Sequence, residues 1–163
     1  MSTLMQANRE WSTRPNDERF VNLYDLHSAV ELARSRSKEK SLSSRGLTAV
    51  PIDGDNDGLQ IVGPNGAPVG VSNWAFGQLA GLAGAPAGYL RNLPAALAAD
   101  NINWGLHHAR DVEDVKTLLT LDDVGPKLRA VTGPGYGRIW NATITKALCD
   151  RFGDGLSGDF RVP

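Results

Sequence analysis

Three aspartates at alternate positions form the pattern in this sequence that most resembles a metal site. Asp53, Asp55 and Asp57 are followed directly by Gly58. Calcium loops likewise place oxygen ligands at the first, third and fifth positions and a glycine at the sixth. The twelfth position should be glutamate but is Pro64, and strand-like segments flank the loop. A polar turn is therefore the favoured interpretation, with a metal-dependent enzyme acting on nucleic acid as the alternative.

Cations and aromatic residues are interleaved with glycines between residues 127 and 141. The residues concerned are Lys127, Arg129, Tyr136, Arg138 and Trp140. Lysine and arginine can neutralise phosphates, and aromatic rings can stack on exposed bases. The two-residue period of a strand predicts that Lys127 and Arg129 share one face. We predict a groove for nucleic acid, with single-stranded DNA favoured; the alternative is a tryptophan in the core beside solvated cations.

A second group of cations follows the first expected helix. Arg34, Arg36, Lys38 and Lys40 alternate with serine and glutamate. We predict that these four side chains grip the phosphate backbone of the same ligand. A solvated helix end that frays into a linker through residue 46 is the alternative interpretation.

The composition is that of a globular protein. Its 163 residues include one cysteine, Cys149, which excludes an internal disulfide and a cysteine-based zinc site. The residues up to Arg14 lack the apolar core of a signal peptide, and no apolar run reaches the roughly 18 residues of a membrane helix. We expect a cytoplasmic protein that makes no membrane contact, and no motif predicts a cofactor.

Charge is distributed unevenly along the chain, although the net charge is only −1. Residues 1–46 carry +2, residues 47–126 carry −6 and residues 127–163 carry +3. The basic ends are compatible with nucleic-acid binding. The acidic middle would suit contact with another protein, so a protein-interaction module that modulates a host system is a second alternative.

Turn residues and alternating apolar residues predict five strands. Three of them, separated by polar turns, form a small meander, and the other two form a β-hairpin. The predicted segments are residues 47–52, 59–62, 67–71, 115–121 and 127–132.

Apolar periodicity and capping residues predict the helices. Asn22 can cap a helix over residues 23–35, and Ser72 a helix over residues 73–83. A further helix begins at Pro94 and runs to about residue 107, and Asn141 can cap the last helix, which stops at Gly153. We expect these last two helices to turn their large apolar residues toward the core, namely Leu93, Leu97 and Trp104 in the first and Ile144, Leu148 and Phe152 in the second.

The predicted elements indicate an α+β fold: a small antiparallel β-meander and a β-hairpin packed with several helices. Residues 1–46 are expected to form an N-terminal arm and helix, and residues 47–163 the α+β core. Residues 160–163 look like the start of another extended segment, so we expect the protein to continue beyond them.

Three stretches carry a resemblance to a known family: residues 4–20, residues 75–90 and residues 128–141. They read LMQANREW through DERF, AFGQLA through PAGYL, and LRAV through YGRIWN. Together they resemble the N-terminal part of the phage/plasmid-like protein family, a domain of unknown function. The resemblance implies carriage on mobile elements and a longer protein. The order of meander, helices and hairpin also suggests a distant analogy to phage single-strand annealing proteins.

We therefore predict a nucleic-acid-binding protein of a phage or plasmid. Its expected role is single-stranded DNA binding or annealing in recombination, as a module that is not an enzyme and forms a homo-oligomer. The groove residues and the four cations of residues 34–40 would contact the ligand.

Overall fold

The computed structural model describes residues 19–54, 58–108 and 114–156 of the chain. The chain divides into two compact units. Unit 1 joins the residues up to Ser35 with those from Ile139 onward, and unit 2 comprises Arg36–Arg138. The described residues form five α-helices, a short 3₁₀ helix and six strands, so the predicted α+β class is confirmed.

Unit 2 contains one six-stranded sheet with the order β1-β5-β6-β4-β3-β2. Its strands are β1 (Ser37–Ser43), β2 (Thr48–Pro51), β3 (Leu59–Val62), β4 (Pro68–Val71), β5 (Asp114–Asp122) and β6 (Gly125–Thr132). The predicted meander is β2–β3–β4 and the predicted hairpin is β5–β6. The two join into one sheet because β4 and β6 pair in parallel, Gly70 with Lys127 and Val71 with Leu128.

Strand β1 contradicts the alternative interpretation of the segment up to residue 46 as a frayed linker. It pairs with β5 along its whole length, from Ser37 opposite Thr120 to Ser43 opposite Asp114. The segment has no alternating apolar pattern of its own. Its partner strand β5 lies far along the chain: Thr117 Oγ1, which donates to the Lys40 carbonyl, is 77 residues away in sequence. The 3₁₀ helix η2 (Ser44–Gly46) then links the two edge strands, β1 and β2.

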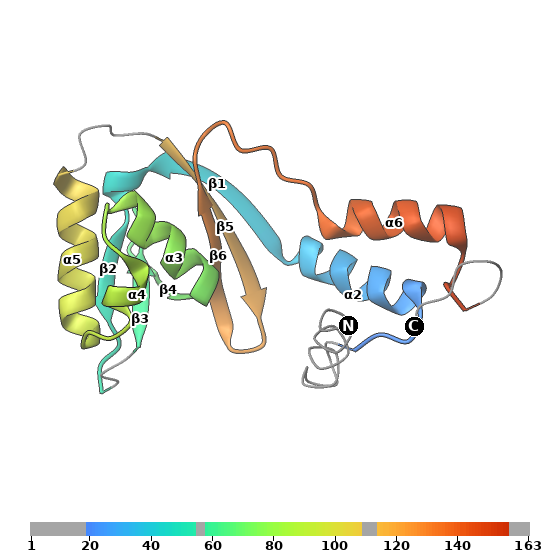
Figure 1. Cartoon of the computed structure of the whole chain (residues 1–163), viewed down its shortest axis with the longest axis horizontal. Helices are drawn as coiled ribbons and strands as arrows, with labels where there is room; N and C mark the ends of the chain where they lie inside the picture. The colour runs from blue at the N-terminus through green and yellow to red at the C-terminus, as the bar shows by residue number, and fades with distance from the viewer. Residues whose placement is uncertain (1–18, 55–57, 109–113, 157–163) are drawn as a thin grey trace, which may run out of the picture. The chain divides into compact units, whose positions relative to one another are not determined.

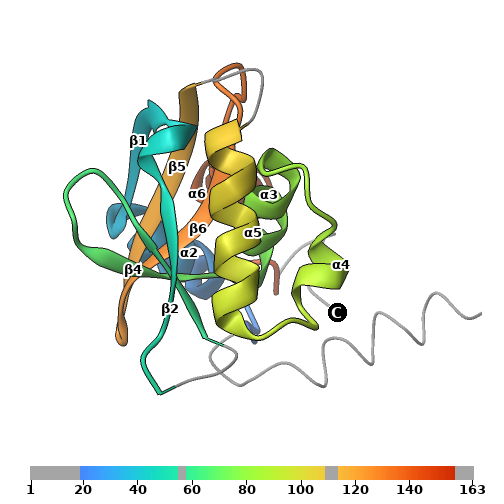
Figure 2. The same ribbon diagram turned by 90° about the vertical axis from the view of Figure 1, so that its left-hand side faces the viewer.

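Three helices pack on one side of this sheet: α3 (Asn73–Leu82), α4 (Ala87–Leu90) and α5 (Ala95–His108) (Figures 1 and 2). Ser72 caps α3 as predicted, because its Oγ accepts the Ala75 N–H at 3.2 Å. The core between helices and sheet is apolar and nearly solvent-free. Its largest fully buried side chains are Leu79, Leu90, Ile102, Leu106, Val115 and Leu128.

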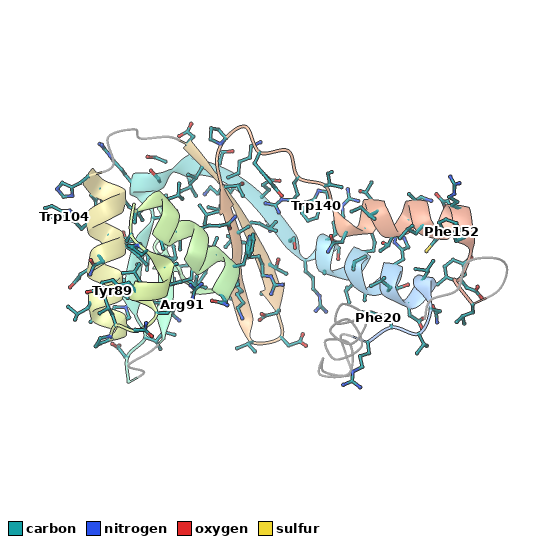
Figure 3. All side chains as sticks on the ribbon, in the orientation of Figure 1. Phe20, Tyr89, Arg91, Trp104, Trp140 and Phe152 are labelled. Atoms are coloured by element: carbon teal, nitrogen blue, oxygen red, sulfur yellow. The ribbon has the colours of Figure 1, made fainter. Side chains whose placement is uncertain are left out.

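Helix α5 turns a different face to the core than its large residues suggested. Leu97 is 51% exposed and Trp104 is 68% exposed, while Leu93 lies at the edge of the core. The buried residues of α5 are instead Ala95, Ala98, Ala99, Ile102 and Leu106. Small residues bring a helix axis close to its neighbours, and Leu97 and Trp104 lie outside this close contact, as Trp104 shows (Figure 3).

Unit 1 pairs α2 (Leu23–Ser35) with α6 (Asn141–Phe152). The predicted cap of α2 is confirmed, because Asn22 Oδ1 accepts the Asp25 N–H at 2.7 Å. His27 Nδ1 lies 2.9 Å from the hydroxyl of Thr145, which is buried. Ile144 is 48% exposed, contrary to expectation. Ala142 and Thr145 are the buried residues of α6, so a narrow face of small side chains meets α2.

Within the described residues, no helix combines the length and the apolar character that crossing a membrane requires.

Candidate nucleic-acid interface

The sheet of unit 2 has two chemically different faces. One row crosses all six strands in register and consists of Val50, Gln60, Gly70, Lys127, Thr120 and Ser37. The face that bears this row is named the outer face. The opposite, inner face bears Leu119, Leu128 and Val131 and packs into the core. Along this row the outer face offers hydrogen-bonding groups, whereas the next outer-face row across β1, β5 and β6 is Glu39, Leu118 and Ala130, which are acidic or apolar.

Lys127 lies in a shallow hollow of the outer face. The hollow measures about 320 Å³ and is lined by Lys127 together with Gln60, Gly70 and Asp122. The lysine chain passes over Gly70, where its Cγ would lie in ordinary van der Waals contact, 3.9 Å, with a Cβ at position 70. The Asp122 carboxylate makes hydrogen bonds within its own turn, because its Oδ1 accepts the N–H groups of Val124 and Gly125. Lys127 forms no ion pair within the part of the chain that the structure describes.

A second cluster forms where the chain leaves β6 and returns across the sheet. Lys116 lies on the outer face of β5, opposite Thr132, and its Nζ donates to the Tyr136 carbonyl at 3.0 Å. The Tyr136 ring is near the Arg138 guanidinium, 5.5 Å from its carbon to the ring centroid. Tyr136 remains 47% exposed. A lysine and an accessible aromatic ring therefore lie together on this surface.

Arg138 supports this cluster from within. Its side chain is only 13% exposed, and its Nε lies 3.6 Å from Glu39 Oε2 on strand β1. A largely buried guanidinium that faces a carboxylate is poorly placed to meet a phosphate, because its charge is already balanced. Arg138 is therefore better suited to positioning Tyr136 than to gripping a ligand.

The prediction that Lys127 and Arg129 share one strand face assumed a regular strand, and β6 is irregular at Arg129. Leu119 pairs with Leu128, but the next residue along, Leu118, pairs with Ala130. Arg129 is thus the extra residue of a β-bulge, and a bulge breaks the two-residue period. Its side chain is exposed, and its carbonyl accepts a hydrogen bond from Ser72 Oγ at 3.1 Å.

The cations of residues 34–40 do not gather beside Lys127. Arg36 on the approach to β1 is 3.5 Å from Asp123. Lys38 pairs with Leu119 of β5, which places it on the inner-face side of β1. Lys40 lines an inner-face hollow of about 70 Å³ with Leu42 and Thr117. The two lysines and Lys127 therefore belong to opposite faces of the sheet.

Arg34 and Trp140 belong to unit 1. There the guanidinium carbon of Arg34 lies 5.5 Å from the centroid of the Trp140 ring. Such a pair is a typical cation–π contact, and Trp140 is half-buried. The predicted groove residues are thus divided between the two units.

The aspartate turn holds no assembled metal site among the residues described. Asp53 is exposed beside Gly54, whose φ of +80° marks a turn. Asp55 and Asp57 lie outside the described residues. Elsewhere in the described part of the chain, no three His, Cys, Asp or Glu residues group as metal ligands would.

Sequence reasoning missed Lys116, although a signal for it existed. Its position in the hairpin, two residues before Leu118 and four before Thr120, already placed it on the face of those residues. Its proximity to Tyr136 depends on the course of the chain after β6, which no local pattern encodes. Scans against protein-family models, curated proteins and solved structures gave no match to this chain.

Proposed function

We propose that unit 2 binds single-stranded DNA across the outer face of its sheet. The observation that carries this proposal is the cross-strand row with Lys127 at its centre and the Lys116–Tyr136 cluster beside it. Sheet faces that combine cations with accessible aromatic rings suit single strands, because the cations follow the phosphates and the rings stack on unpaired bases.

The spacing of the two lysines supports an extended ligand. Lys116 is four residues from Thr120, the β5 partner of Lys127. At about 3.3 Å per strand residue, the two positions are roughly 13 Å apart along the strand direction. Two cations at this separation favour a strand that runs along β5 and β6. Arg129, at the bulge of β6, would add a third cation in contact with the ligand.

The proposed biological role is recombination on a phage or plasmid, through annealing of complementary strands by an oligomer. It rests on the resemblance of three sequence stretches to the phage/plasmid-like family and on the analogy to annealing proteins. The full chain is expected to accelerate pairing of complementary oligonucleotides and to elute as an oligomer in size-exclusion chromatography with light scattering. An uncatalysed annealing rate would remove the annealing role but leave the binding proposal standing.

Fluorescence anisotropy with labelled single-stranded and duplex DNA across a salt series tests the binding proposal. Wild-type protein should bind the single strand more tightly and with a strong salt dependence. Lys116→Gln combined with Lys127→Gln should weaken binding and lower the log–log salt slope by about 1.4, since each phosphate contact on a single strand contributes about 0.7.

Lys38→Gln combined with Lys40→Gln is the matched control, because it removes the same charge from the inner-face side of β1. Its affinity should remain near that of the wild type. A larger loss in this control than in the Lys116/Lys127 variant would place the DNA on the other face of the sheet.

A further inference from the structure

A second candidate site lies on the helix side of unit 2. A pocket of about 280 Å³ opens where α3, α4 and α5 meet β3 and β4. Seven of the ten residues that line it are apolar, among them Leu59, Val71, Phe76 and Leu90, and polar groups contribute about half of the lining surface. Val71 pairs with the inner-face residue Leu128, so this pocket is on the opposite side of the sheet from the proposed DNA surface. This volume lies just below the roughly 300–1,000 Å³ typical of small-molecule sites, so it suits a small ligand or the end of a chain.

Three polar residues line the pocket: Ser72, Asn73 and Arg91. Arg91 is the one charged residue among those that line it. Its Nε donates to Asn73 Oδ1 at 3.0 Å, and its Nη2 donates to the Asn73 carbonyl at 3.2 Å. The guanidinium carbon also lies 5.1 Å from the Phe76 ring centroid. Arg91 is exposed, and these contacts orient its guanidinium while using two of its five N–H donors. Figure 3 shows Arg91 beside α4.

We propose that this pocket binds a small carboxylic acid with an aromatic or branched aliphatic body. The apolar lining would take the hydrocarbon, since burial of such surface is favourable. The remaining donors of Arg91 would hold the carboxylate, because a guanidinium matches a planar carboxylate with two parallel hydrogen bonds. A single cation balances the single negative charge of a carboxylate better than the double charge of a phosphate.

Titration of the full chain with 3-phenylpropionate, followed by two-dimensional amide NMR, tests the site. Saturable shifts are expected at the amides of Phe76, Leu90 and Ala98, which line the pocket. The neutral analogue 3-phenylpropionamide should bind at least tenfold more weakly to the same protein. No saturable shift at these amides, or equal affinity for the acid and the amide, would overturn the proposal.

Arg91→Gln should reduce the affinity for 3-phenylpropionate at least tenfold, while Arg45→Gln should leave it unchanged. Arg45 is a suitable control because it is exposed on η2 and does not line the pocket. Equal affinity of the two variants would contradict the role of Arg91. The comparison of acid with amide uses unaltered protein, so it decides the matter even if Arg91→Gln disturbs the fold.

A second probe distinguishes the two possible sources of the carboxylate, a free acid and a protein C-terminus. N-acetyl-glycyl-phenylalanine presents the same ring and carboxylate at the end of a peptide chain. Tighter binding of this probe than of 3-phenylpropionate assigns the site to a protein C-terminus, and weaker binding assigns it to a free acid. DNA binding is measured on the other face of the sheet, so failure of either proposal is visible without the other.

Discussion

Gly105 of α5 lies against the backbone at the C-terminal end of α3. A Cβ at this position would overlap the carbonyl oxygen and the Cα of Ala83, the residue that ends α3. Backbone atoms cannot rotate away as a flexible side chain can, so any larger residue must push α5 from α3. This contact explains why α5 buries alanines and leaves Leu97 and Trp104 outside.

Gly105→Ala is therefore expected to lower the free energy of unfolding by about 3 kcal/mol, the upper end of the usual cost of overpacking. Gly81→Ala is the matched control in α3, because a Cβ at position 81 meets nothing within 4 Å. It should raise stability by about 0.5–1 kcal/mol, since alanine is favoured over glycine inside a helix. Urea unfolding followed by circular dichroism measures both, and equal stabilities would contradict the close contact.

Single-residue signals were the most successful part of the sequence-based prediction. Asn22 and Ser72 cap their helices, and Gly153 ends α6 with a φ of +66°. The predicted cap at Asn141 is wrong, because Asn141 is the first residue of α6 and Trp140 stands at the N-cap without a side-chain hydrogen bond. Caps and turns depend on interactions between near neighbours, so a local pattern encodes them. The side of α5 that faces the core depends instead on the non-local contact of Gly105 with Ala83, which the pattern of large apolar residues cannot reveal.

At the scale of elements, α5 protects the edge of the sheet at β2. Asn103 Oδ1 accepts the Ala49 N–H at 2.7 Å, and its Nδ2 donates to the Ala49 carbonyl at 2.9 Å. One side-chain amide thus makes the two bonds that a neighbouring strand would make. Open strand edges promote aggregation, and this amide closes the edge at its central position.

Asn103→Ala is expected to cost about 1–3 kcal/mol, because it leaves two backbone groups of Ala49 without partners. Asn101→Ala serves as the control, since Asn101 is exposed and only bonds the Leu97 carbonyl of its own helix. Its effect should be within about 0.5 kcal/mol. Hydrogen exchange offers a direct readout: the Ala49 amide should exchange faster in the Asn103 variant only, and unchanged protection would refute the role assigned to Asn103.

Five of the six strands were predicted from the sequence, and β1 was not. Strands β2 to β6 were found because each has an alternating or apolar pattern bounded by turn residues. Strand β1 was missed because the sequence of Ser37–Ser43 is almost wholly polar. Its charged residues suit an edge strand, which needs to discourage further pairing. Only the partner β5, distant in sequence, makes this segment a strand.

At the scale of the whole molecule, the proposed DNA surface is smaller than the sequence suggested. The predicted contacts included Arg34 and Trp140, which belong to unit 1, and Lys38 and Lys40, which belong to the inner-face side of β1. Lys127 and Tyr136 remain on the unit 2 surface, joined by Lys116. Residue types alone identify candidate cations and aromatic rings for the ligand. The face of the sheet on which each side chain lies depends on strand pairing and on bulges.

The net charge of −1 also bears on this surface. A protein without a large excess of positive charge cannot attract DNA by its overall field, so binding must depend on a few local contacts. Stacking on Tyr136 should therefore carry a large share of the affinity. Tyr136 is the exposed aromatic residue of the cluster that the described residues form around Lys116.

The most direct test compares Tyr136→Ala with Tyr89→Ala in binding to a labelled single strand. Tyr89 is 60% exposed on α4, away from the outer face, so its loss removes an accessible tyrosine without altering the proposed surface (Figure 3). Tyr136→Ala should weaken binding by about 5- to 150-fold, as expected for one stacked base at about 1–3 kcal/mol, while Tyr89→Ala should bind as wild type. No binding by the wild type, or equal binding by both variants, would contradict DNA recognition on the outer face.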